Sequence, residues 1–83
     1  MDYLLIFKSK RYNVGKNEAK RLLQLLGCKQ ITFPVLCKHK VIKFVSDMSK
    51  ENIEEYMINN CEFVEKIIEF DSEIHQRKSR IKF

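Results

Sequence analysis

Five apolar residues stand together near the start of the sequence, Tyr3-Leu4-Leu5-Ile6-Phe7. A half-exposed strand would alternate apolar and polar residues, whereas a short unbroken run rich in aromatic and branched side chains is typical of a strand buried on both faces. We therefore predict a central strand here. The later segments are expected to pack against this strand or to pair with it.

The next apolar pattern is helical. Residues 8–16 form a polar, basic stretch that is predicted to be a loop. Asn17 is then expected to cap a helix that begins at Glu18, because a short polar side chain can accept hydrogen bonds from the free N–H groups of a helix start. Gly27 is placed to end this helix. Its predicted apolar face consists of Ala19, Leu22, Leu23 and Leu26.

Two strand-like segments follow, at residues 30–36 and 41–46. The short polar connection at residues 37–40 makes them a predicted hairpin. Pro34 lies in the first segment and has no backbone N–H to donate. That strand is therefore predicted at an edge of the sheet or at a bulge.

A second helix and a last strand complete the predicted order. Ser49 is the expected N-cap of the helix, and Asn59 and Asn60 are expected to end it. Residues 63–70 mix apolar and charged side chains as an outer strand does, with a continued helix as the alternative. The apolar stripe of the helix is Ile53, Tyr56 and Met57.

Together these segments predict an α+β domain with the ferredoxin-like β-α-β-β-α-β order. We expect a four-stranded antiparallel sheet with two helices on one face. Right-handed crossovers would place the first and third strands at the centre and the second and last at the edges. The domain is expected to span residues 1–70, and residues 71–83 are expected to form a basic C-terminal tail.

The charge of the chain is unevenly distributed. Residues 1–43 contain ten Lys and Arg against two acids, a local net charge of +8, whereas residues 44–75 contain two lysines against nine acids, a net charge of −7. A basic half of this kind indicates an anionic partner, most commonly a phosphate backbone. The alternative is a basic surface that only keeps the fold soluble.

The basic residues gather in two places, the stretch after the first strand and the hairpin connection around His39. Lys and Arg there are predicted to neutralise phosphates, and Tyr12 to stack on an unpaired base. The sequence leaves open whether the two places adjoin. The predicted RNA-binding residues are Lys8, Lys10, Arg11, Tyr12, Lys16, Lys20, Arg21, Lys38 and Lys40.

The sequence shows no arrangement suited to catalysis. No serine lies in a glycine elbow, and the two glycines stand too far apart to form a phosphate-binding loop. Cys28, Cys37 and Cys61 form no C-x-x-C pair and match no zinc pattern with the histidines. We therefore expect a cytoplasmic protein with buried, reduced thiols that uses no metal or cofactor and has no membrane partner.

The aromatic residues are expected in the core. A sheet of this topology also occurs in the RNA recognition motif, whose exposed aromatics on the central strands stack on bases. The third predicted strand carries only Phe44, which is too little for such a platform. Phe7, Phe33 and Phe44 are therefore predicted to be packing residues.

Three segments carry a family pattern: Tyr3-Leu4-Leu5-Ile6-Phe7, Glu18-Ala19-Lys20-Arg21-Leu22-Leu23-Gln24-Leu25-Leu26-Gly27 and the closing segment Asn60-Cys61-Glu62-Phe63-Val64-Glu65-Lys66-Ile67-Ile68-Glu69. Over residues 3–70 the chain resembles the N-terminal ferredoxin-like domain of the THUMP-containing tRNA guanine-N2 methyltransferases. The resemblance implies a non-catalytic accessory module that binds RNA, with tRNA as its first candidate, beside a THUMP or methyltransferase subunit. No catalytic residue is carried over, because the 83 residues contain no Asn-Pro-Pro-Tyr or Asp-Pro-Pro-Tyr motif.

Two other functions stay open on the sequence. A protein-interaction or oligomerisation module would pair sheet edges or dock a basic partner on its acidic half. A small enzyme is the other alternative, because acylphosphatases share this fold. Their glycine-rich phosphate loop after the first strand is missing here.

Overall fold

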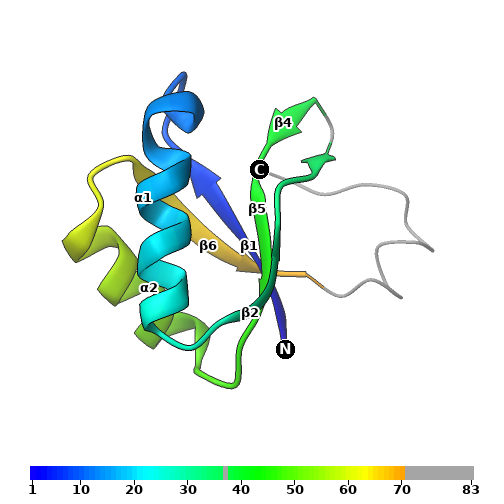
Figure 1. Cartoon of the computed structure of the whole chain (residues 1–83), viewed down its shortest axis with the longest axis vertical. Coiled ribbons are helices and arrows are strands. Elements are labelled where there is room, and N and C mark those ends of the chain that lie inside the picture. Colours follow the sequence, from blue (N-terminus) through cyan, green and yellow to red (C-terminus); the bar gives the residue numbers. More distant parts are fainter. Residues whose placement is uncertain (37, 71–83) are drawn as a thin grey trace.

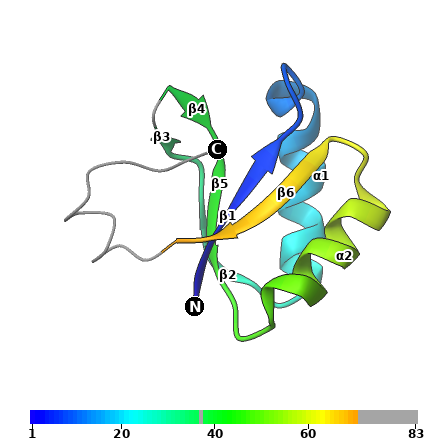
Figure 2. The same cartoon turned by 180° about the vertical axis from the view of Figure 1, so that it is seen from behind.

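The computed structural model describes residues 1–36 and 38–70 and has the predicted α+β architecture (Figure 1). The sheet strands are β1 (Asp2–Phe7), β2 (Lys29–Thr32), β5 (Ile42–Val45) and β6 (Val64–Glu69), and the helices are α1 (Tyr12–Leu25) and α2 (Lys50–Asn60). These elements follow the ferredoxin-like β-α-β-β-α-β order, and all pairings in the sheet are antiparallel. Both helices cover the same face of the sheet (Figure 2).

The strand β1 lies at the centre, as its apolar run predicted. The sheet order is β2-β5-β1-β6, so β2 and β6 form the edges. Leu5 is paired with Ile42 of β5 on one side and with Ile67 of β6 on the other. Alternate residues of β1 are buried in two separate apolar clusters, one of which contains Leu5 and the other Leu4. The run is unbroken because both of its faces are buried.

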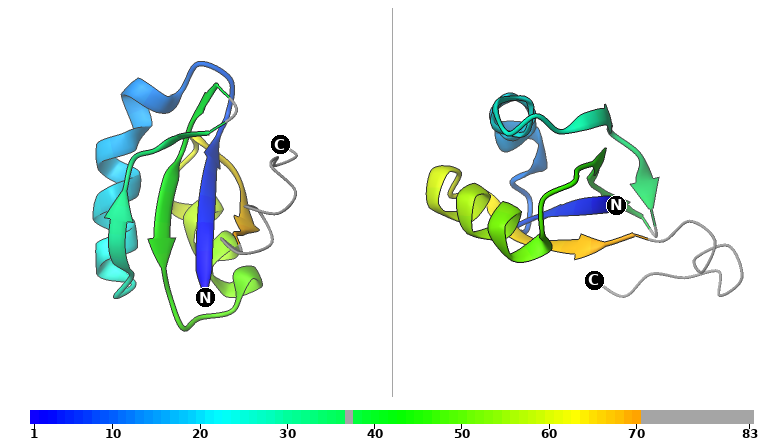
Figure 3. Two further views of the ribbon diagram at one scale, coloured as in Figure 1. Left: turned by 90° about the vertical axis from the view of Figure 1, so that its right-hand side faces the viewer. Right: turned by 90° about the horizontal axis from the view of Figure 1, so that it is seen from below.

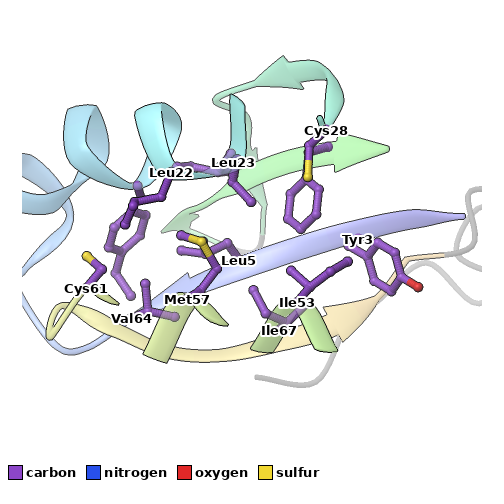
Figure 4. Close-up of a cluster of buried hydrophobic side chains, with 14 residues drawn as sticks. Tyr3, Leu5, Leu22, Leu23, Cys28, Ile53, Met57, Cys61, Val64 and Ile67 are labelled. Carbon is purple, nitrogen blue, oxygen red and sulfur yellow. The ribbon is translucent and has the colours of Figure 1, made fainter. Parts of the chain in front are cut away.

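The main core fills the space between the sheet and the helices (Figure 4). Leu22 and Leu23 reach into it from α1, and Ile53 and Met57 reach into it from α2. Leu23, Ile53 and Met57 are fully buried. The predicted apolar faces of both helices are thus the faces that pack on the sheet, with the predicted Leu26 and Tyr56 partly buried at the margin.

The start of α1 differs from the prediction. The helix begins at Tyr12, well before Glu18, and the predicted loop over residues 8–16 is a short turn closed by a hydrogen bond from the Arg11 N–H to the Lys8 carbonyl at 3.0 Å. No side chain caps this helix start, and Asn17 lies inside the helix. Packing takes the place of the cap, because the Tyr12 ring meets the buried Phe7 ring edge to face at 5.4 Å.

Gly15 lets the first turns of α1 lie against the segment before β6. A Cβ atom at this buried position would lie 2.8 Å from the Cβ atom of Phe63. A Cβ atom cannot move without its backbone, so Gly15→Ala is expected to lower the free energy of unfolding by about 1–3 kcal/mol. This loss is expected although alanine favours a helix by ~1 kcal/mol more than glycine does. Urea unfolding measures this change.

The matched control is Gly27, which has φ +82° and no atom within 4 Å of an added Cβ. Substitution there costs only backbone strain, about 1–2 kcal/mol, so Gly27→Ala and Gly27→Ser are expected to lose the same stability. At Gly15, serine is expected to cost more than alanine, because each added atom meets Phe63. Equal losses for the two Gly15 variants would contradict this close packing.

The end of α1 is the one predicted at Gly27. The Gly27 N–H donates to the Gln24 carbonyl and the Cys28 N–H donates to the Leu23 carbonyl, both at 3.0 Å. These two bonds define a Schellman motif, which needs a left-handed residue such as this glycine.

The predicted strand over residues 30–36 is interrupted at Pro34. The edge strand β2 stops before it, and the next residues form β3 (Val35–Leu36), which pairs with β4 (His39–Lys40) in a separate two-stranded hairpin. Because the chain leaves the sheet here, Phe33 is 38% exposed, and its prediction as a core residue was wrong. Phe7 and Phe44 are buried, as predicted. Cys37 lies outside the described residues.

The second half of the domain follows the prediction. The Ser49 hydroxyl accepts a hydrogen bond from the Asn52 N–H at 3.3 Å and caps α2. Residues 64–69 are extended, and the Glu54 carboxylate accepts a hydrogen bond from the Ile67 N–H of this edge strand at 2.8 Å. Glu54 thus takes up a backbone donor of an edge strand, which restrains pairing with another chain. The predicted basic tail at residues 71–83 lies outside the described residues.

Candidate nucleic-acid interface

The two basic places predicted from the sequence adjoin in the structure. The turn after β1 and the β3–β4 hairpin lie at the same end of the sheet (Figure 1 and Figure 3). Between them is an open hollow of about 480 Å³, which we call the basic hollow. Its lining includes Lys8, Lys10, Tyr12, Lys38, His39, Lys40 and Glu65.

Tyr12 joins the elements that line this end of the molecule. Its partly buried ring is fixed by the edge-to-face contact with Phe7. The Nζ atom of Lys16 lies 5.5 Å from the Tyr12 ring centroid, and that of Lys40 lies 5.7 Å from it. Each cation–π contact at an exposed site contributes about 0.5–1 kcal/mol. The ring therefore holds together an ammonium group from α1 and one from β4.

Two lysines of the basic hollow have a left-handed backbone. Lys10 has φ 60° and Lys38 has φ 67°, and both side chains are exposed. This conformation costs a residue with a side chain about 1–2 kcal/mol, which glycine avoids. Positive charge is thus kept at two positions where the backbone alone favours glycine, and strain of this kind clusters at functional sites.

A second, smaller hollow of about 210 Å³ lies beside the first, and Tyr12 lines both. We call it the aromatic hollow. The Nζ atom of Lys20 lies 5.9 Å from the centroid of the Phe33 ring. Phe33 was predicted to be a packing residue and not a site residue, although its place directly before Pro34 marks the point where a strand stops. The lining residues are Tyr12, Lys16, Asn17, Lys20 and Phe33.

Arg11 and Arg21 are the predicted residues that stand apart from these two hollows. Arg11 lines a separate hollow of about 340 Å³ with Lys8, Glu62 and Phe63. Arg21 is paired with Glu18 at 3.5 Å on the exposed side of α1. An exposed pair of this kind contributes little to stability, about 0–1 kcal/mol. Arg11 thus extends the basic surface at its margin, and Arg21 faces a neighbouring acid.

Metal sites and membrane spans have requirements that the described residues do not meet. Among residues 1–36 and 38–70, no group of three or more His, Cys, Asp or Glu is arranged to hold a metal ion, and no helix is long and apolar enough to cross a membrane. Cys28 and Cys61 are buried free thiols. Burial raises the pKa of the Cys28 thiol, although a hydrogen bond with Ser46 opposes the shift, so this thiol is protonated near neutral pH.

No family model, curated protein or solved structure matches this chain. The resemblance to the THUMP-containing methyltransferases therefore stays a prediction from the sequence.

Proposed function

We propose that this protein is a non-catalytic RNA-binding module that contacts the phosphate backbone with the basic hollow and the aromatic hollow. The proposal rests on two observations: Lys16 of α1 and Lys40 of the hairpin both approach the ring of Tyr12, and Lys8 and Lys10 of the turn after β1 line the same hollow as that ring. A basic surface that served only solubility would not need its charges gathered in this way.

The charges around the two hollows suit an anionic polymer. Their lining residues include lysines from several elements and one carboxylate, Glu65. Lysine ammonium groups neutralise phosphates without reading sequence. We therefore propose binding that depends on the RNA backbone, with tRNA as the first RNA to test because of the resemblance to the methyltransferases.

The salt dependence of binding tests this function. If about four to six of these charges contact phosphate, a plot of log affinity against log salt is expected to have a slope of about −3 to −5. Fluorescence anisotropy with labelled tRNA and with an unrelated structured RNA, at low and at physiological salt, measures the slope and the preference. A slope near zero, or no binding to either RNA at low salt, would refute the proposal.

Sheet-edge pairing with another protein is the competing function. At β6 the Glu54 carboxylate already accepts the hydrogen bond from the Ile67 N–H, which disfavours strand addition at this position. Size-exclusion chromatography at two salt concentrations separates the two functions. A homodimer that persists at high salt, together with no RNA affinity, would favour the protein-interaction function.

A further inference from the structure

We infer that the aromatic hollow takes an unpaired nucleobase that stacks on Phe33, so that the ligand of this surface is single-stranded or bulged RNA. The inference rests on the proposed RNA-binding function and adds to it the class of RNA. The inference is based on the position of the exposed Phe33 ring, which lies beside the Lys20 ammonium group and next to the rim of the basic hollow.

The exposed ring of Phe33 is held on an ordered backbone. Pro34 follows it and restricts Phe33 to extended conformations. The Pro34 carbonyl accepts a hydrogen bond from the Val41 N–H at 3.2 Å, which ties this connection to the start of β5. Because the backbone that carries the ring is already restrained, only the side chain itself has to be ordered when a flat ligand stacks on it.

The size of the aromatic hollow limits what it can take. Its volume of about 210 Å³ lies below the ~300–1,000 Å³ of sites for cofactors and drug-sized ligands. A single ring system fits such a hollow better than a whole dinucleotide. Asn17 adds a side-chain amide to the rim, which offers both hydrogen-bond donors and an acceptor to a polar ring edge.

The charges beside Phe33 favour a nucleobase over an apolar peptide. Lys16 and Lys20 line the same hollow, and Tyr12 connects it to the lysines of the basic hollow. Proteins that bind single strands combine aromatic stacking platforms with a cationic groove that follows the backbone. Bases in a continuous duplex are stacked on each other and leave no face for Phe33, so a duplex can contact this surface only through the lysines of the two hollows.

The test compares a single-stranded RNA of about 12 nucleotides with its duplex, at one salt concentration, for the wild type and three variants. Phe33→Leu is expected to weaken single-strand binding by about 5- to 150-fold, the equivalent of the ~1–3 kcal/mol that stacking of one base provides, and to leave duplex binding unchanged. Phe33→Tyr keeps an aromatic face and is expected to retain the wild-type affinity. Val35→Ala is the matched control, since Val35 is 62% exposed nearby and lines neither hollow.

A strand that carries 2-aminopurine reports on stacking, because its fluorescence changes when the base leaves its neighbouring bases and packs on a protein ring. A fluorescence change on binding to the wild type and to Phe33→Tyr, and its loss in Phe33→Leu, is the expected result. If the wild type binds RNA with the expected salt slope but Phe33→Leu binds the single strand equally well, the stacking site is wrong and the RNA-binding function stands. A wild type that binds only the duplex leads to the same conclusion, whereas one that binds neither RNA overturns both proposals.

Discussion

Charge reversal at Lys10, Lys16 and Lys40 is expected to weaken RNA binding at low salt by at least about 100-fold. These lysines come from the turn after β1, from α1 and from the β3–β4 hairpin, and all of them line the two hollows. Each Lys→Glu change removes one attraction to phosphate and adds one repulsion, and a unit charge at about 4 Å in water is worth ~1 kcal/mol. Anisotropy titration of the triple variant measures the loss.

The control for this prediction is a second triple reversal, at Lys29, Lys50 and Lys66. These lysines line none of the three hollows. Each set lowers the formal net charge from +5 to −1, since each Lys→Glu change removes two charges. The control is expected to lose much less affinity than the first set, because close charges act more strongly than distant ones that salt screens. Equal losses would show that net charge, and not this surface, governs the binding.

A pair of glycine substitutions distinguishes a loss of RNA affinity from a loss of stability. Lys10→Gly and Lys38→Gly remove two charges from the basic hollow and also relieve a left-handed backbone. They are expected to weaken RNA binding while the protein stays at least as stable. Gln30→Gly relieves the same strain, at φ 53°, at a position that lines none of the hollows, and is expected to leave the affinity unchanged.

The order of elements could be predicted because each depended on a local signal. The unbroken run at residues 3–7 indicated a strand buried on both faces, and Gly27 indicated the end of α1. The start of α1 lacked such a signal. It depends on packing, that of the Tyr12 ring against Phe7 and that of Gly15 against Phe63, and the second pair is far apart in the sequence. A contact of this kind outweighs the helix-start preferences of Asn17 and Glu18, and no sequence pattern shows it.

The candidate interface was predictable in composition but not in shape. The charge count pointed to the basic half of the chain, whereas only the fold shows that Lys16 and Lys40 approach the same tyrosine ring. Phe33 was predicted to pack in the core together with Phe7 and Phe44. That prediction failed because the chain leaves the sheet at Pro34, which leaves an exposed ring beside Lys20.

Phe44→Ala is expected to lower the free energy of unfolding by about 3–5 kcal/mol, a large share of the ~4–12 kcal/mol typical of a domain of this length. Phe44 lies fully buried on the central strand β5, and its ring stacks on that of Tyr3 with 5.6 Å between the centroids. It belongs to the buried cluster between the sheet and the helices, so a base that approaches the sheet cannot contact its ring. Thermal or urea unfolding measures the loss, with the milder Phe44→Leu as the control.

The two phenylalanines are therefore expected to give opposite results. Phe44→Leu, tested at a temperature where it is folded, is expected to bind RNA as the wild type does, because its side chain lines neither hollow. Phe33→Leu is expected to unfold as the wild type does and to bind single-stranded RNA less tightly, because an exposed ring contributes little to the core. A loss of RNA affinity in folded Phe44→Leu that matched the loss in Phe33→Leu would show that the affinity depends on an intact core and not on the exposed ring beside α1.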